Sequence, residues 1–220
     1  MTFHGQWNPP VDEVLFRNYF PGPGIGTFME CGAGDGITDS SCLFFEEHGW
    51  FGVNIEPCVD MYKKLQKNRP KSCNLNLGLS ERFGPHSCFA VMENDLEVGV
   101  MVKHEPWLDH LMQKGFTSRK SIVEMTTYER LVRQTNIESL NLFVLDVEGH
   151  ELQVIKGMIS SRILPDVICA EYSFVGLKKL RATLQELDYR FDFHSFNNAF
   201  FSRRRDIIPC WGATPLMETT

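Results

Sequence analysis

A short apolar run that leads directly into a cluster of glycines constrains the fold of this chain more than any other feature. Residues 26–36 read Gly-Thr-Phe-Met-Glu-Cys-Gly-Ala-Gly-Asp-Gly. The pattern predicts a buried strand that turns sharply into a helix, because glycine adopts positive φ and lets the backbone approach a neighbour or a ligand closely. In α/β proteins such a turn lies at the carboxyl end of a strand, where nucleotide-like ligands bind.

An acidic residue follows the next predicted strand. Residues 50–55 have the apolar character of a strand, and they are followed by Glu56 and Pro57. In Rossmann-type folds an acid at this position binds the hydroxyl groups of a ribose. Alternatively, Glu56 only caps the helix that begins after Pro57, since proline suits a first helical turn.

Strands and helices are expected to alternate along most of the chain. The expected strands are residues 26–31, 50–55, 72–77, 140–145, 166–171, 189–193 and 198–202, and the expected helices are residues 38–48, 58–68, 128–135, 151–160 and 176–187. Alternation is typical of a mostly parallel sheet with helices on both faces. The last two strands are separated by a short loop, which predicts an antiparallel hairpin at the sheet edge. The predicted fold is therefore α/β, with a mostly parallel seven-stranded sheet that resembles the class I methyltransferase form of the Rossmann-like fold.

The length of 220 residues predicts one domain over residues 1–220. Residues 84–121 are the least regular part, and we expect them to form an inserted hairpin and loop over the pocket mouth, where specificity commonly resides. The Gln6-Trp7 segment is a second expected cover. Lys103, His104, Trp107 and Arg119 in the insert either contact substrate or are solvated or packing residues.

Charge and apolar patterning exclude several classes of partner. A net charge of −6 argues against binding to nucleic acid or to an anionic membrane, which both need clustered Lys and Arg. No leader pattern or apolar run of about 18 residues is present, so a cytoplasmic protein is expected. The seven cysteines form no C-x-x-C pair and are expected to be reduced. A homodimer is left open, because aromatic residues between Tyr189 and Phe201 could be exposed and form an edge contact.

The acids around the glycine turn favour a positively charged ligand over a pyrophosphate. Glu30 directly precedes the turn, which also lacks the third glycine of a dinucleotide fingerprint. In dinucleotide sites the helix N–H groups bind a pyrophosphate, which an adjacent carboxylate would repel. S-adenosylmethionine (SAM) instead carries a sulfonium, an α-ammonium and ribose hydroxyls. The acids that suit this cofactor are Glu30, Asp35, Glu56 and Asp146.

Four segments resemble methyltransferases of the FkbM type, SAM-dependent enzymes with the Rossmann-like fold that mostly methylate hydroxyl groups of sugars and natural products. The segments are Gly5-Gln6 with Tyr19-Phe20, residues 28–36, residues 49–57 with Asn68-Arg-Pro70, and residues 143–151. The Asp-x-Glu-Gly-His-Glu pattern of the last segment is the most specific. Two positions depart from the family: Gly34 often aligns with Asn, and Ser40-Ser41-Cys42 with Ser-Asn-Thr. The second departure is expected to remove one contact at the helix start near the cofactor.

The resemblance implies a role for each matching residue in binding SAM. Glu30, Gly32 and Gly34 would hold the methionine part, and Glu56 the ribose diol. Leu79 or Ser80, after the third strand, would contact the adenine. Asp146, after the fourth core strand, would face the methyl-donor end of SAM.

The catalytic candidates lie between residues 146 and 151. Glu148 and His150 are both candidates to take the proton from the hydroxyl being methylated, and a neutral histidine suits that task near neutral pH. Alternatively, His150 only orients Glu148, and Glu151 is a first-turn acid favoured by the helix dipole. Asp146, Glu148 and Glu171 could also form an oxygen-rich Mg²⁺ site.

The predicted function is SAM-dependent methylation of a hydroxyl group on a sugar, glycan or natural-product small molecule. An NAD-dependent oxidoreductase or epimerase is disfavoured by Glu30 and by the lack of a Tyr-x-x-x-Lys pair. A non-catalytic binding module would be expected to lose the acids of residues 146–151, which this chain has. A nucleic-acid methyltransferase is disfavoured by the acidic charge and by the lack of an Asn/Asp-Pro-Pro-Tyr motif.

Overall fold

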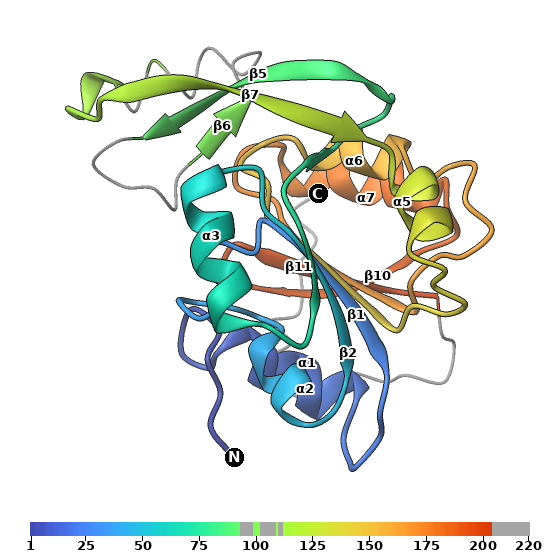
Figure 1. Cartoon of the computed structure of the whole chain (residues 1–220). Coiled ribbons are helices and arrows are strands. Elements are labelled where there is room, and N and C mark those ends of the chain that lie inside the picture. The colour runs from blue at the N-terminus through green and yellow to red at the C-terminus, as the bar shows by residue number, and fades with distance from the viewer. Residues whose placement is uncertain (93–98, 102–108, 110–111, 204–220) are drawn as a thin grey trace.

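The computed structural model describes residues 1–92, 99–101, 109 and 112–203, and its main sheet has the predicted seven strands (Figure 1). These are β1 (Thr27–Cys31), β2 (Phe51–Ile55), β3 (Cys73–Leu75), β8 (Leu142–Leu145), β9 (Val167–Glu171), β10 (Arg190–Ser195) and β11 (Asn198–Ser202). Their order is β10-β11-β9-β8-β1-β2-β3. Neighbours from β3 to β9 pair in parallel, whereas β11 pairs antiparallel with both β9 and β10. The predicted α/β class I Rossmann-like fold is confirmed.

The strand order places the glycine turn at the middle of the sheet. β1 lies between β2 and β8, so the chain crosses to opposite sides of β1 at this point. The register pairs Cys31 with Ile55 on one side and with Leu145 on the other. Because these three parallel strands end at the same edge, the residues that follow them meet there, as expected for a ligand crevice at a topological switch point.

Two helical layers cover the two faces of the sheet (Figure 1). Successive residues of β1 alternate between them: Met29 packs with α5 (Tyr128–Gln134), α6 (Glu151–Lys156) and α7 (Leu177–Gln185), whereas Phe28 packs with α1 (Val11–Tyr19) and α2 (Leu43–Glu47). This alternation is the period of a strand that is buried on both faces. None of the helices in the described ranges is long and apolar enough to cross a membrane.

The helices differ from the prediction in three places. The helix expected over residues 38–48 is formed only at Leu43–Glu47, because residues 32–42 are taken up by the glycine turn and its hydrogen bonds. The helix after β2, α3 (Val59–Asn68), matches closely, and α6 ends at Lys156 rather than at residue 160. α1 was not predicted, although its apolar residues at positions 11, 14 and 15 have helical spacing.

A second sheet lies beside the first and includes part of the predicted insert (Figure 1). Its strands, in the order β4-β7-β5-β6, are β4 (Gly78–Leu79), β5 (Gly84–Met92), β6 (Gly99–Met101) and β7 (Ser118–Thr126). The expected hairpin is thus part of a four-stranded sheet, in which β4 lies before residue 84 and β7 ends after residue 121. Lys103, His104 and Trp107 lie outside the described residues. Arg119 forms an ion pair with Asp60 of α3 at 2.5 Å.

The aromatic residues of the β10–β11 hairpin are mostly buried, contrary to the expectation behind the edge contact. Tyr189, Phe193, Phe200 and Phe201 are at most 4% exposed, and Phe191 is partly buried against the core. The exception is Phe196 in the turn, which is 48% exposed. The homodimer stays a prediction, and the buried aromatic side chains are not available for its contact.

Candidate functional site

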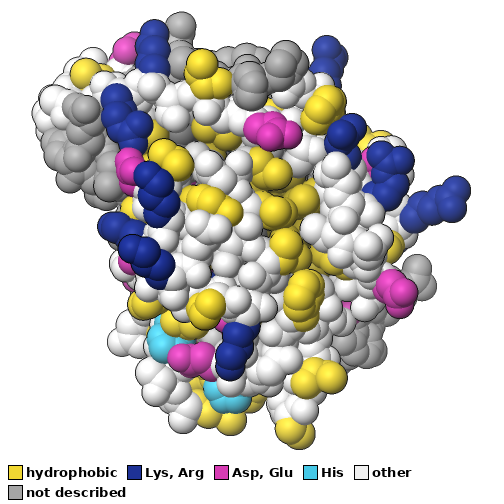
Figure 2. Space-filling view, in the orientation of Figure 1, with side chains coloured by type: hydrophobic (Ala, Val, Ile, Leu, Met, Phe, Trp, Pro, Cys, Tyr) yellow, Lys and Arg dark blue, Asp and Glu magenta, His cyan; other side chains and the backbone are white. Residues whose placement is uncertain are grey.

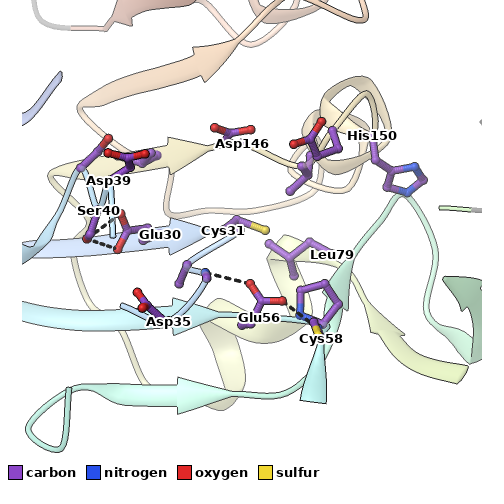
Figure 3. A pocket seen from close by; sticks show the side chains of 18 of the residues that line it. Glu30, Cys31, Asp35, Asp39, Ser40, Glu56, Cys58, Leu79, Asp146 and His150 are labelled. Atoms are coloured by element: carbon purple, nitrogen blue, oxygen red, sulfur yellow. Dashed lines mark hydrogen bonds between the residues drawn. The ribbon is translucent and has the colours of Figure 1, made fainter. Parts of the chain in front are cut away.

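A cavity of about 340 Å³ opens at the carboxyl edge of β1, β2 and β8 (Figure 3). Its volume lies in the range of small-molecule sites in proteins. The predicted site residues that line it are Glu30, Gly32, Gly34, Asp35, Glu56, Leu79, Asp146, Glu148 and His150. Ser80 and Glu171 are not among the lining residues. Ser80 is hydrogen-bonded to His150 and Glu171 to Asp146, and both of these partners line the cavity. Nine predicted site residues thus lie among the 24 that line this cavity, whereas sequence analysis missed others, including Asp39, Val144 and Asn198.

The glycine turn is held against the loop after β8. Gly32 has φ +86°, and a Cβ atom there would lie 1.8 Å from the carbonyl oxygen of Asp146. The amide of Asp146 also donates to the carbonyl of Cys31 at 3.0 Å. By contrast, a Cβ atom on Gly34, with φ +56°, would meet only the end of Met61 at 4.0 Å. Gly32 is thus required by packing of the protein on itself, and Gly34 borders the open cavity.

Glu56 joins the glycine turn to the start of α3 while it lines the cavity. Its two carboxylate oxygens accept hydrogen bonds from the amides of Gly34 at 2.8 Å and Cys58 at 2.7 Å (Figure 3). Cys58 is the N-cap residue of α3, so the capping contact that the sequence left open is present. Burial raises the pKa of Glu56 to about 7, although the two amide hydrogen bonds act to lower it.

Asp35 stabilises the turn from the outside. One carboxylate oxygen accepts hydrogen bonds from the amides of Ile37 and Thr38, both at 2.8 Å. Partial burial acts to raise the pKa of Asp35, but these amide hydrogen bonds outweigh it and the pKa is lowered. Asp35 is therefore ionised and partly committed to the backbone of the turn.

Glu30 has a buried cation beside it that sequence analysis did not predict. Arg69 is completely buried, and its Nη1 lies 3.6 Å from a Glu30 carboxylate oxygen and donates to the carbonyl of Gly36 at 3.1 Å. Its Nε donates to Glu46 at 2.5 Å. Burial raises the pKa of Glu30, and the guanidinium of Arg69 acts to lower it. Arg69 thus offsets part of the cost of burying an acid in this wall.

Ser40 replaces the contact that was expected to be lost at the start of α2. Its hydroxyl donates to the Glu30 carboxylate at 3.0 Å and accepts a hydrogen bond from the amide of Leu43 at 3.1 Å. The chain therefore stabilises this helix start with the Ser40 hydroxyl. The departure at Ser41 leaves the helix start satisfied.

The loop that carries the catalytic candidates is held in an uncommon conformation. Glu148 has φ +52° and Gly149 has φ +94°. The buried carboxylate of Glu151 accepts hydrogen bonds from the amides of Val147 at 3.2 Å and Gly149 at 3.1 Å. Glu151 is in the first turn of α6, as expected, and its main contact is with this loop. A non-glycine residue in the left-handed region is unfavourable, and such residues cluster at functional sites.

Asp146 lies in a group of carboxyl side chains at one end of the cavity. Desolvation raises its pKa well above the ordinary value, and the nearby Glu171 and Glu148 carboxylates raise it further. Its carboxyl group also shares a hydrogen bond with Glu171. Glu171 in turn accepts a hydrogen bond from the Asn197 side chain at 2.7 Å. Such a pair retains a proton more readily than an isolated aspartate does.

His150 lies on the side of the cavity formed by the chain after β4. Its Nε2 atom is 3.0 Å from the Ser80 hydroxyl, and the residue is the N-cap of α6. Figure 3 shows the ring directed away from Asp146. The structure therefore brings together His150 and Ser80, two residues to which the sequence assigned different tasks.

The suggested Mg²⁺ site finds no support. Within the described part of the chain, no group of three or more His, Cys, Asp and Glu side chains is arranged to hold a metal ion. The physical reason is that the Glu171 carboxylate is engaged by Asn197 and by Asp146, so Asp146, Glu148 and Glu171 do not converge on one empty point.

Comparison with known proteins identifies one family. The sequence model described as Methyltransferase FkbM domain matches residues 30–191. No curated protein matches the chain significantly. Similar solved structures include a ribosomal protein L11 methylase from Lactobacillus delbrueckii subsp. bulgaricus, with 10% identity, a TM-score of 0.44 and coverage of 87% of this chain and 75% of that one. Another is a SAM-dependent methyltransferase from Leishmania major, with 11% identity, a TM-score of 0.39 and coverage of 87% and 72%.

Proposed function

The chain belongs to the FkbM methyltransferase family, and we propose that it transfers a methyl group from SAM to a hydroxyl oxygen of a sugar, glycan or other small natural product. The family membership gives the reaction class and the cofactor. The choice of oxygen as the acceptor atom and of a small-molecule substrate is our proposal. It rests on the residues that line the cavity and on the charge of the chain.

The charge of the cavity is the observation that carries the proposal. The described lining residues include six carboxyl side chains, Glu30, Asp35, Asp39, Glu56, Asp146 and Glu148, and no Lys or Arg. A cofactor with a sulfonium and an ammonium group fits such a wall, whereas a pyrophosphate would be repelled. The acidic lining of this cavity therefore fits SAM.

Three strand ends would hold different parts of the cofactor. Glu30, kept beside Arg69 and Ser40, would bind the α-ammonium group. Glu56 would accept hydrogen bonds from the ribose diol, since its carboxylate already lies at the cavity wall. Leu79 would pack against the adenine. Ser80 would not contact the adenine directly; it would hold His150 in place by the hydrogen bond between them.

Proton removal is the chemical task left to the protein. When bound, SAM supplies an electrophilic methyl group on a positively charged sulfur. Glu148 is the proposed base, because it lines the cavity from a loop that Glu151 holds in a fixed, uncommon conformation. His150 would position this loop and the Ser80 segment. Asp146 would lie beside the reacting groups. Its raised pKa favours the protonated carboxyl group, which can donate a hydrogen bond.

A small acceptor is favoured over a nucleic acid. The net charge of the chain is −6, and on the face drawn in Figure 2 the Lys and Arg side chains lie mostly along the left and upper right sides, with acidic side chains among them. Binding to a polyanion depends on clustered basic side chains.

The proposal is tested by methyl transfer from radiolabelled SAM to a panel of acceptors. The panel contains neutral glycosides, phenols, carboxylic acids and primary amines, and products are identified by mass spectrometry. Methylation of a hydroxyl group supports the proposal. Transfer only to amines or carboxylates would overturn the choice of a hydroxyl acceptor, while retaining the reaction class.

The affinity for SAM is expected to rise with pH between about 6 and 8. Below pH 7 the free protein holds a proton on Glu56, whose pKa is raised to about 7 by burial, but a ribose diol binds the carboxylate. Binding therefore releases a proton, and the affinity should fall by up to about tenfold per pH unit below 7. Calorimetry at pH 6.5 in two buffers of different ionisation enthalpy measures this release, and Glu56→Gln should reduce it. Equal proton release by the variant would contradict the assignment to Glu56.

A further inference from the structure

Two exposed aromatic side chains stack on each other beside the cavity. The rings of Trp7 and Phe196 are nearly parallel, with an interplanar angle of 9° and centroids 4.8 Å apart. Trp7 is 42% exposed and Phe196 is 48% exposed. Gln6, which precedes Trp7, and Asn198, two positions after Phe196, line the cavity. The pair thus brings an apolar surface from the amino-terminal segment and the β10–β11 turn close to the proposed reaction site.

The segments that carry the pair are well anchored. The Phe196 carbonyl accepts a hydrogen bond from the Tyr172 hydroxyl at 2.8 Å. On the other side, the amides of His4 and Gly5 donate to the Asp12 carboxylate at 2.7 and 3.0 Å. These anchors hold the two rings in place although nearly half of each is in solvent.

The conformation of the pair is unfavourable for the free protein. Trp7 has φ +80° and Phe196 has φ +52°, in a region that bulky side chains rarely adopt. Exposure of large aromatic surface is unfavourable as well. The two-residue turn between β10 and β11 accounts for the positive φ of Phe196, whereas packing within the chain does not explain why both rings are exposed. A ligand that covers the rings accounts for their exposure.

The polar groups around the pair indicate an uncharged, hydroxylated ligand. Gln6 and Asn198 carry amide groups, which can donate and accept hydrogen bonds with hydroxyls. The adjacent Asn197 side chain donates to Glu171, which shares a hydrogen bond with Asp146. A phosphorylated or carboxylated acceptor would face these carboxyl groups without a Lys or Arg in the described wall of the cavity. A sugar ring has the matching combination of an apolar face and several hydroxyl edges.

We propose that the stacked Trp7–Phe196 pair is the binding platform for a neutral pyranose ring of the acceptor, which presents a hydroxyl group to the cavity. This assignment rests on the proposed function, because it treats the cavity as the place of methyl transfer. The pair contacts the apolar face of the sugar, and the amide groups at the rim bind its hydroxyl edges.

Saturation-transfer NMR tests the platform with defined probes. Methyl α-D-glucopyranoside, methyl α-D-mannopyranoside and methyl α-L-rhamnopyranoside are titrated into the protein with and without S-adenosylhomocysteine. At least one pyranoside should bind, and its dissociation constant should rise about fivefold or more in Trp7→Ala and in Phe196→Ala, in line with the loss of an aromatic stacking partner. Phe51→Ala is the matched control, since Phe51 is 50% exposed at the opposite end of β2.

Several results would overturn the platform. They are the absence of pyranoside binding, equal binding by wild type and both platform variants, or Trp7-dependent binding of catechol but of no pyranoside. Trp7→Phe should retain most of the affinity, which separates the loss of a ring from the loss of folding. Calorimetry with S-adenosylhomocysteine distinguishes the two proposals: if the cofactor product binds and the sugars do not, only the platform fails. If the sugars bind and the cofactor product does not, the proposed function fails.

Discussion

Replacement of Gly32 by alanine is expected to lower the free energy of unfolding by about 3–5 kcal/mol. A Cβ atom at this position would lie 1.8 Å from the Asp146 carbonyl oxygen, and φ is +86°. The neighbouring atom is backbone on the β8 side of the central crevice, so relief of the contact requires separation of two strand ends. Urea denaturation followed by circular dichroism measures the loss.

Gly34→Ala is the matched control for this prediction. Gly34 also has a positive φ, of +56°, but a Cβ atom there would meet only the flexible end of Met61, at 4.0 Å. Only the backbone conformation is then unfavourable, and the expected loss is about 1 kcal/mol. If the two variants were equally stable, contact between the glycine turn and the Asp146 loop would not be what requires glycine at position 32.

Glu148→Gln is expected to lower the rate of methyl transfer by about 10²–10⁴-fold, the usual contribution of a general base. Glutamine keeps the size of the side chain but does not accept a proton. The affinity for SAM should change by less than about threefold, because Glu148 is not one of the proposed cofactor ligands. Single-turnover transfer from radiolabelled SAM to the acceptor identified in the panel measures the rate.

His150→Gln separates the two candidate bases. His150 is hydrogen-bonded to Ser80 at 3.0 Å. Its replacement should therefore only shift the loop that it positions, and the transfer rate should fall by less than about tenfold. The rise of the transfer rate with pH that reports ionisation of the base should remain in this variant and disappear in Glu148→Gln. A larger loss for His150→Gln than for Glu148→Gln would assign the proton to the imidazole instead.

The strands were predictable because their signal is local. Apolar runs bounded by Gly, Pro and polar residues predicted all seven strands of the main sheet within a few residues. The parallel direction of most strands followed from their alternation with helices. The second sheet was harder, since β4 has only two residues and β5 to β7 are interrupted by irregular sequence. The short α2 was overestimated because the hydrogen bonds of the glycine turn compete with the helix start.

The candidate site was predictable where residues follow strand ends. Glu30, Glu56 and Asp146 come directly after or at the end of three neighbouring parallel strands, so topology alone brings them together. The role of Arg69 was not predictable, because its sequence neighbours place it at an exposed helix end, and only the tertiary structure buries it beside Glu30. The Trp7–Phe196 pair joins residues 189 positions apart in sequence, and no local pattern indicates such a contact.

Calorimetric titration with SAM and S-adenosylhomocysteine tests the central claim, that the acid-lined cavity binds this cofactor. The wild-type protein is predicted to bind both with dissociation constants near micromolar. Glu56→Gln should weaken binding about 10- to 100-fold at pH 8, because two charge-assisted hydrogen bonds of about 1.5–3 kcal/mol each become neutral ones of about half that strength. Glu186→Ala, a change of an exposed acid at the end of α7, should bind as the wild type does. No binding of either ligand by the folded wild-type protein, or equal binding by Glu56→Gln, would contradict the account.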